Sequence, residues 1–306
     1  MPSAALLSIL LSLLCCVGML LPGTSCPAAE LEILAAGDTT PGMRMLEQRP
    51  DALFSPEALA RITAADAFLW NCETSGPSTR GKDKPFLFRA DAALLAKMAL
   101  PNGIAVTANN HVFDGLAEGA ANLLALLDGA DIRHNGLYTT ASYAPLRLSA
   151  PEQRPVYLLC GSPIARGGSG PYLRVPDYSQ LLRTTIALRR EQPQALLILF
   201  IHDGTESQYA PDARQRQWAD MLAWAGADVL LFAHSHRYGL LEVLHDTPRR
   251  TLVAWSLGNF LFGGNRRWRS HRDVRILSLR LNLDTGSRSA RWLYGYTDNW
   301  TFFLYQ

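Results

Sequence analysis

"VTANNHVFDG", from Val106 to Gly115, sets an apolar run directly against two carboxamides and an imidazole, at Asn109, Asn110 and His111. Four other apolar runs also end in a carboxylate or an imidazole, those at 31–38, 67–73, 195–202 and 228–236. Where the strands of an α/β sheet end, the loops converge on rigid supports and form the ligand site. The recurrence therefore predicts an α/β fold with one polar site at the ends of its strands.

Amphipathic segments of helical length separate these apolar runs. One opens with Ser55 as an N-cap and Pro56 at the first helical position. The others span 89–100, 115–130 and 212–227. The run at 274–283 alternates polar and apolar residues, which is typical of a sheet edge or of a strand with an exposed face. We expect residues 30–306 to form one α/β domain.

The composition is that of an ordinary globular chain with a sizeable core. It has 306 residues, of which 48% are hydrophobic and 18% are charged. The formal net charge is only +2, so the chain lacks the overall basic field of typical nucleic-acid-binding proteins. We therefore expect no nucleic-acid partner, and recognition of any anion has to be local.

Residues 1–29 have the build of a signal peptide or N-terminal anchor. An uncharged apolar run from Ala4 to Leu21 is followed by Pro22, Gly23 and small residues. No Lys or Arg precedes the run, which is nearly long enough to remain in a membrane, and "GTSC" ending at Cys26 faintly resembles a lipoprotein cleavage box. The sequence therefore predicts an exported protein of the periplasm or cell envelope, with an anchor or a lipoprotein as alternatives.

Cys72 and Cys160 each lie in an apolar strand-like run. A cysteine in such a run is most often a small buried hydrophobe, but an export compartment permits a disulfide between them. The sequence leaves both possibilities open. It contains no CxxC pair that would indicate a thiolate zinc site.

The residues that end the apolar runs form a complete donor set for a transition metal. They are Asp38, Glu73, Asn110, His202, His234 and His236. Carboxylate, amide oxygen and imidazole are ligands of Mn, Fe and Zn. Each residue alone has a structural explanation, such as a turn, a cap or a satisfied core histidine. Because several separate runs end in this way, we expect one or two divalent ions per chain.

Seven motifs along the chain resemble, in order, those of the CapA family, bacterial proteins associated with poly-γ-glutamate capsule synthesis. They are "GDTTPG", "WNCETS", "FRAD", "TANNHVFDGLAEG", "FIHDGTES", "GADVLLFAHSHRYG" and "AWSLGNFLFG". The resemblance runs from about Leu31 to Phe262. The CapA family is similar to calcineurin-like metallophosphoesterases. The resemblance therefore implies a layered β-sandwich flanked by helices, an αββα arrangement.

The resemblance also implies a role for each candidate residue. It assigns the metal ligands as follows: Asp38 and His236 for a first ion, Glu73 as the carboxylate that bridges two ions, and Asn110, His202 and His234 for a second ion. His111 matches the non-ligand histidine that protonates the leaving group. In such a site the paired charges lower the pKa of a shared water and stabilise charge that develops on the substrate.

Four positions depart from the patterns of these families. Thr40 stands where phosphoesterases carry a histidine, as it does in CapA proteins, so the first ion is one imidazole short. That ion then binds weakly or not at all, which leaves a mononuclear site as an alternative. Asp203 replaces the usual tryptophan of the CapA family and Ser207 its usual tyrosine, whereas "HSH" is closer to phosphoesterases than the family's "HPH".

The segment "GGNRRWRSHRDVR", from Gly263 to Arg275, concentrates five arginines in an almost neutral chain. They are Arg266, Arg267, Arg269, Arg272 and Arg275. One explanation is a solvated surface loop, and the other is a substrate-binding segment beside the metal site. For the second we name Arg266, Arg267 and Arg269, together with Asn259, which would orient substrate or a ligand.

The sequence thus predicts an exported, CapA-like, metal-dependent protein of poly-γ-glutamate or capsule polymer metabolism, acting as a hydrolase. The alternatives are a metallophosphodiesterase acting on phosphoesters and a non-catalytic subunit for capsule assembly or binding. The expected partners are an anionic polymer or phosphoester substrate and membrane-bound capsule machinery.

Overall fold

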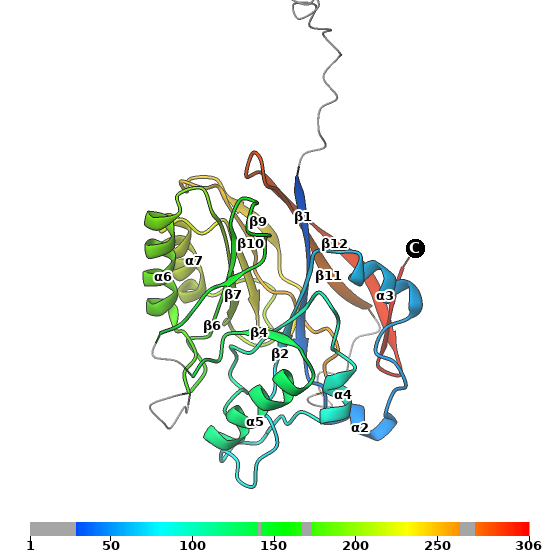
Figure 1. Ribbon diagram of the computed structural model, residues 1–306. Coiled ribbons are helices and arrows are strands. Elements are labelled where there is room, and N and C mark those ends of the chain that lie inside the picture. The colour runs from blue at the N-terminus through cyan, green and yellow to red at the C-terminus, as the bar shows by residue number, and fades with distance from the viewer. Residues whose placement is uncertain (1–28, 140–141, 167–172, 264–272, 306) are drawn as a thin grey trace, which may run out of the picture.

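Two β-sheets packed face to face form the centre of the computed structural model (Figure 1). The structure describes residues 29–139, 142–166, 173–263 and 273–305. The predicted leader lies outside these ranges except for its last residue, as do Arg266, Arg267, Arg269 and Arg272 of the basic segment. Within the described ranges, no helix is long and apolar enough to cross a membrane.

The first sheet has seven strands among the described residues, in the order β13-β12-β11-β1-β2-β3-β4. Their bounds are β1 (Glu30–Thr39), β2 (Ala67–Cys72), β3 (Gly103–Val106), β4 (Arg133–Asn135), β11 (Asp273–Asn282), β12 (Arg288–Asp298) and β13 (Thr301–Leu304). Strands β1 to β4 are parallel, and β11 to β13 extend the sheet as an antiparallel meander beside β1.

The second sheet has six strands in the described part of the chain, in the order β5-β6-β7-β8-β10-β9. Their bounds are β5 (Leu146–Arg147), β6 (Val156–Gly161), β7 (Leu196–His202), β8 (Val229–Ala233), β9 (Leu241–Leu244) and β10 (Thr251–Ala254). The four central strands are parallel, and antiparallel strands form the two edges.

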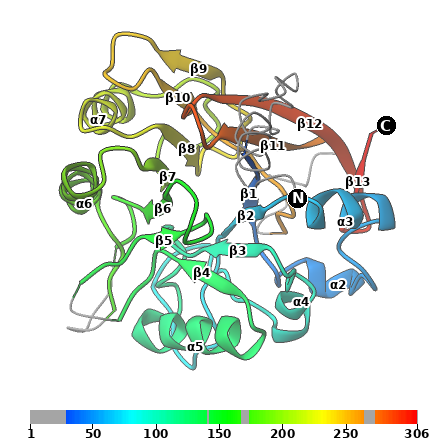
Figure 2. The ribbon, with the colours of Figure 1, turned by 45° about the horizontal axis from the view of Figure 1, so that its top comes forward.

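Helices cover the outer face of each sheet (Figure 2). The second sheet is covered by α6 (Tyr178–Glu191) and α7 (Ala213–Trp224). The first sheet is covered by α2 (Met45–Gln48), α3 (Pro56–Thr63), α4 (Ala92–Ala96) and α5 (Leu116–Gly129). The predicted α/β class and its layered, helix-flanked sandwich are confirmed.

Side chains that alternate along the strands build the core. In β2, Leu69 faces the other sheet whereas Phe68 and Trp70 face the helices, and all three are fully buried. Ile198 and Leu231 complete the central layer from the second sheet. Because the opposite sheet covers one face and helices cover the other, the parallel strands read as continuous apolar runs.

Some elements differ from those expected. β11 lies between β1 and β12, so the sheet-edge explanation for the run at 274–283 is wrong, and its polar positions reflect partly exposed residues such as Arg275 and Arg280. α4 stops at Ala96, well before the end of the run at 89–100. The sequence pattern missed α6 and β12, because their residues are polar over much of the surface.

Cys72 and Cys160 are both free and buried. Cys72 packs on the helix side of the first sheet, whereas Cys160 packs between the sheets. Burial raises the pKa of both thiols. The structure therefore agrees with the first interpretation, in which both cysteines are small buried hydrophobic residues, and not with a disulfide between them.

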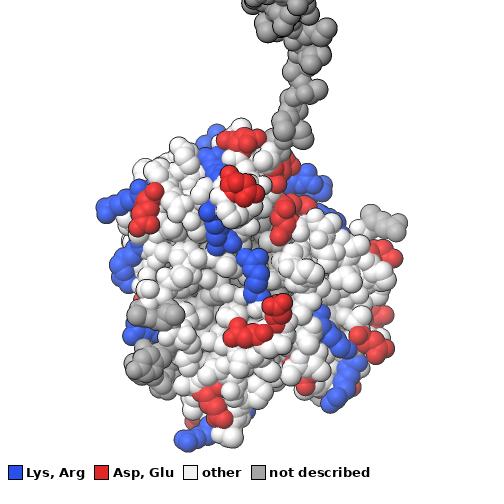
Figure 3. Space-filling view, in the orientation of Figure 1, with Lys and Arg blue, Asp and Glu red and all other residues white. Residues whose placement is uncertain are grey.

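The charged surface is mixed in sign. On the face in Figure 3, Lys and Arg side chains alternate with Asp and Glu, and neither sign dominates a large area. This matches the formal net charge of +2. Any strong attraction for an anion must arise from a local group of residues.

Candidate metal centre

The six predicted ligand residues lie together where the parallel strands of both sheets end. They sit at the ends of β1 and β7, just after β2, and in the turns after β3 and β8: Asp38, Glu73, Asn110, His202, His234 and His236. All except Asn110 are buried. The two sheets face each other, and their parallel strands have their carboxyl ends at the same edge. Residues up to 198 positions apart in sequence therefore meet there.

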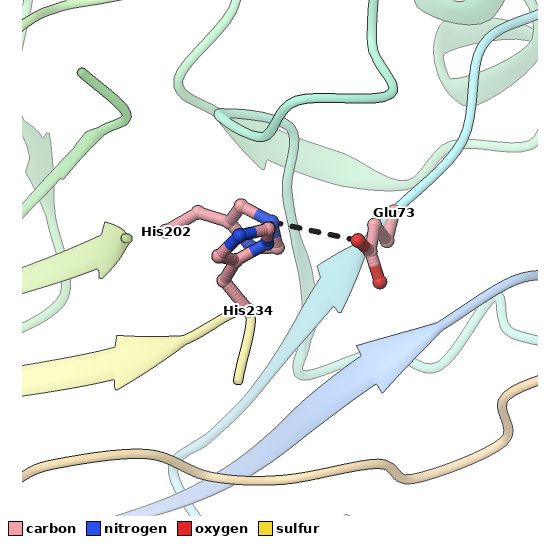
Figure 4. Close-up of side chains that lie close together, drawn as sticks. All are labelled: Glu73, His202 and His234. Carbon is pink, nitrogen blue, oxygen red and sulfur yellow. Dashed lines mark hydrogen bonds and ion pairs between the residues drawn. The ribbon is translucent and has the colours of Figure 1, made fainter. Parts of the chain in front are cut away.

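The first cluster contains Glu73, Asn110, His202 and His234, and Figure 4 shows three of these side chains turned toward one another. His202 Nε2 lies 2.8 Å from Asn110 Oδ1, 3.1 Å from His234 Nδ1 and 3.4 Å from Glu73 Oε1. Two imidazole nitrogens, a carboxylate oxygen and an amide oxygen thus converge on one small volume. This is a donor set that suits a divalent transition metal.

The second cluster contains Asp38, Glu73 and His236. His236 Nδ1 lies 3.0 Å from Asp38 Oδ2, and Glu73 belongs to both clusters. Thr40 is buried nearby, but its hydroxyl oxygen accepts a 2.6 Å hydrogen bond from the Gly263 amide. The second cluster therefore offers three potential ligand residues. Thr40 is not one of them, because its hydroxyl oxygen is hydrogen-bonded to the Gly263 amide.

The hydrogen-bonding state of the carboxylates tests whether a cation fits. Both oxygens of Glu73 are buried without a hydrogen-bond partner among the described residues. A buried carboxylate left in this way is costly unless a cation compensates it. Burial and the neighbouring Asp38 raise the pKa of Glu73 well above its ordinary value. A divalent ion would remove this penalty, so the residues fit a metal.

His236 responds to the same carboxylates. Burial by itself would lower its pKa, but Glu73 and Asp38 outweigh burial and raise the pKa to about 9. His202 behaves in the opposite way, because burial lowers its pKa to about 4. At neutral pH the His236 ring thus carries a positive charge, whereas the His202 ring is neutral.

The turn that carries His234 and His236 is strained. Their φ angles are +100° and +58°, a region that residues with a Cβ rarely adopt. Each such residue costs on the order of 1–3 kcal/mol, and such strain gathers at functional sites. The backbone conformation of this turn places both rings beside the carboxylates of the two clusters.

A close approach of two backbones sets the position of Asn259. A Cβ on Gly37 would lie 1.9 Å from the Gly258 carbonyl oxygen, so only glycine allows β1 and the loop after β10 to touch. The Asp38 amide donates to Gly258 O at 2.9 Å. Asn259 Oδ1 then lies 2.8 Å from His236 Nδ1, so Asn259 contacts a candidate ligand residue.

The neighbouring asparagines have supporting positions that sequence reasoning did not assign. Asn71 Nδ2 donates to Asp38 Oδ1 at 2.7 Å and lies 3.0 Å from His202 Nδ1, so it ties the two clusters together. Asn109 Nδ2 donates to Cys72 O at 2.8 Å and thereby fixes the backbone beside Glu73. In the opening stretch, Asn109 is thus structural, and Asn110 belongs to the cluster.

The His111 ring lies beside the first cluster and is held there by Phe88 and Asp114. Its ring stacks on Phe88, with centroids 3.8 Å apart, and its Nδ1 lies 2.7 Å from Asp114 Oδ2. Lys84 forms an ion pair with the other oxygen of Asp114. Burial lowers the pKa of His111 to about 4. The neutral ring donates from Nδ1 to Asp114, so its unprotonated Nε2 faces Glu73 Oε1 at 3.8 Å.

Asp114 and Lys84 were missed by sequence reasoning. The three-residue spacing of His111 and Asp114 was a signal for the first, because the turn brings residues i and i+3 together. No local signal marks Lys84, which lies 27 positions from His111 in the chain and reaches it through a loop.

A cavity of about 460 Å³ opens beside these residues and is called the first cavity here. Its lining includes Lys84, Phe86, Phe88, His111, Glu206 and His236. Ser207 also lines it, whereas Asp203 is buried behind the site, where it accepts a 2.6 Å hydrogen bond from the Tyr178 hydroxyl and pairs with Arg214. Of the departures from the CapA pattern, only Ser207 lines this cavity.

A family model described as "Bacterial capsule synthesis protein PGA_cap" matches residues 32–264, well over half of the chain. The protein described as "PGA biosynthesis protein CapA" of Bacillus subtilis (strain 168) is 33% identical over 86 residues. That alignment covers 28% of this chain and only 21% of the Bacillus protein.

Among solved structures, that of TT1561 from Thermus thermophilus is similar with a TM-score of 0.46 and 15% identity. The superposition covers 86% of this chain and 99% of the Thermus chain. A likeness at this level does not extend to function.

Proposed function

The chain belongs to the CapA family of bacterial capsule synthesis proteins, and we propose that it is an exported, metal-dependent hydrolase of an anionic capsule polymer, with poly-γ-glutamate as the first candidate. The observation that supports this most strongly is Glu73, a fully buried carboxylate with no hydrogen bond among the described residues, shared by two clusters of potential ligands.

The principal ion would be held by Glu73, Asn110, His202 and His234, which supply four donor groups. A second, weaker ion would be held by Asp38, Glu73 and His236. Bound there, Mn, Fe or Zn would supply positive charge for a substrate oxygen and lower the pKa of a nearby water. The weaker site follows from Thr40, whose hydroxyl is occupied by the Gly263 amide.

His111 would move the proton of the reaction. As the oxygen of water bonds to the substrate and the leaving group departs, Nε2 of His111 accepts the proton of that water and transfers it to the leaving atom. Asp114 holds the ring in the tautomer that leaves Nε2 unprotonated. The stack on Phe88 keeps that nitrogen directed at the site.

The function is tested by incubating metal-loaded protein with poly-γ-glutamate and with bis(p-nitrophenyl) phosphate. We expect the polymer to be shortened, and chelation with EDTA to stop the reaction, because hydrolysis depends on the ion. Polymer length is measured by gel filtration and released nitrophenol by absorbance. Hydrolysis of the diester alone would favour a phosphodiesterase instead. If neither substrate were hydrolysed, with or without bound metal, the result would favour an assembly or binding subunit.

Export is tested at the N-terminus of the protein isolated from its native cells. We expect mass spectrometry of the envelope fraction to find a chain that begins between about residue 23 and residue 30, because the apolar leader has the build of a cleaved signal peptide. A diacylglyceryl-modified Cys26 would identify a lipoprotein, and an intact leader in the membrane fraction an anchor. An intact Met1 in a soluble cytoplasmic fraction would contradict export.

A further inference from the structure

A group of arginines lies at the end of the sandwich opposite to the candidate metal centre. Arg249 and Arg250 come just before β10, and Arg288 is the first residue of β12. Asp228, which they surround, comes just before β8, whereas the candidate ligand His234 follows the other end of that strand. β8 has five residues and therefore spans on the order of 17 Å. The arginine group is thus separate from the metal centre.

One buried carboxylate holds three guanidinium groups. Asp228 is fully buried, and its Oδ1 lies 3.0 Å from Arg249 Nε and 3.3 Å from Arg288 Nη1. Its Oδ2 lies 2.8 Å from Arg189 Nη2 and accepts a 2.9 Å hydrogen bond from the Leu197 amide. A single carboxylate balances one of the three positive charges, so a surplus of two remains.

No other carboxylate reduces this surplus in the described part of the chain. There, Asp228 is the only ion-pair partner of the three arginines, and the adjacent Arg250 forms no ion pair. Burial lowers the pKa of Arg288 from its ordinary value, and the neighbouring arginines lower it further. An anion placed among these groups would offset the repulsion between like charges.

A cavity of about 290 Å³ gives an anion access to the group. Its lining includes Arg249, Arg250, Arg288 and Ser287, and it shares no lining residue with the first cavity. Asp228 is not among the described residues that line it. The surplus positive charge therefore faces the cavity, with the carboxylate buried behind the arginines.

Two of the guanidinium groups have N–H groups to spare. Arg288 Nη2 donates to the carbonyl oxygens of Arg249 and Arg250 and so fixes the backbone that carries them. Arg249 contacts Asp228 through Nε, and within the described ranges neither of its Nη atoms forms a hydrogen bond. Arg250 contacts only His245 among the described side chains, through Nη2 at 3.1 Å. Paired N–H groups of this kind match the oxygens of a phosphate.

We propose that this cavity binds a phosphate group, either as inorganic phosphate or as the phosphate monoester of a small molecule. A phosphate dianion matches the surplus of two positive charges, and its oxygens would accept hydrogen bonds from Arg249 and Arg250. The site depends neither on the metal centre nor on the proposed hydrolysis.

The test measures binding of inorganic phosphate and of glycerol 3-phosphate by calorimetry at low salt. The full chain is used both metal-loaded and after dialysis against EDTA, so that phosphate bound at the metal centre is recognised by its loss. We expect the EDTA-treated wild type to bind one phosphate group per chain. Phosphate should also raise its Tm more than chloride of the same ionic strength, because a ligand of the folded state stabilises that state.

The variants are Arg249→Gln and Arg250→Gln, with Arg280→Gln as the matched control. Each of the two variants should raise Kd for the phosphate group by about tenfold or more, since a hydrogen bond between charged groups is lost. Arg280 approaches Glu32 on the first sheet and does not line the cavity, so the control should match the wild type. If Arg249→Gln fails to fold because it loses its contact with Asp228, Arg250→Gln decides, since Arg250 does not pair with that carboxylate.

The two probes separate the sources of the phosphate group. Tighter binding of glycerol 3-phosphate would identify a monoester as the ligand, and tighter binding of inorganic phosphate would identify the free anion. Binding of neither probe to the EDTA-treated wild type would overturn the proposal. An equal Kd in the wild type and in Arg250→Gln would also overturn it and leave the arginines as a solvated surface group.

Discussion

Replacing His202 with alanine should strip the principal metal ion from the protein and abolish turnover. His202 Nε2 is the atom that the other donors of the first cluster approach, at distances from 2.8 to 3.4 Å. Changes to residues that only orient a ligand already weaken metal binding by about 10- to 100-fold, so the loss of a ligand should exceed about a hundredfold. Elemental analysis after dialysis measures the ion per chain.

Asn110→Ala should act in the same direction, since it removes the amide oxygen of the same cluster. His245→Ala is the matched control: this histidine is exposed, contacts Arg250, and follows β9, whose end lies beside the start of β10, at the edge of the sheet opposite to the cluster. Thermal unfolding without added metal separates ligand loss from misfolding. Equal metal content in wild type and both cluster variants would refute the assignment.

The positions of the candidate ligands were predictable from sequence, because they follow a general rule of parallel sheets. Apolar strands in the centre of such a sheet are buried on both faces, so the polar residues that follow Val106 or Phe232 mark the ends of β3 and β8. Sequence therefore identified the strand ends that meet at one edge. Which atoms meet could not be predicted, because Asn71 links the clusters only once β1, β2 and β7 have been brought together.

The surroundings of the ligands were less predictable. Lys84 and Phe88 come from a loop whose sequence has no periodicity, and they reach His111 only through the tertiary fold. The basic segment drew attention to Arg275, but Arg237 was inconspicuous in sequence because it follows "HSH" as a lone charge. Arg237 and Arg275 line one cavity because the fold brings β11 of the first sheet close to the turn that follows β8 of the second sheet.

His111→Gln should lower kcat by about 10²- to 10⁴-fold, the usual contribution of a positioned proton-transfer group. Glutamine fills much of the same volume against Phe88 but cannot take up and release a proton. The loss should depend on the leaving group. An amide nitrogen needs a proton to depart, whereas nitrophenolate does not, so kcat for the polymer should fall much further than kcat for bis(p-nitrophenyl) phosphate.

The controls separate proton transfer from metal binding and from orientation. His111→Gln should retain full metal content, because the ring is 3.8 Å from Glu73 and lies outside both clusters of potential ligands. Asp114→Asn should cause a smaller loss, since it weakens the hold on Nδ1 but leaves the imidazole in place. Equal losses of kcat on the polymer and on the diester, with metal retained, would contradict transfer of a proton from His111 to the leaving atom.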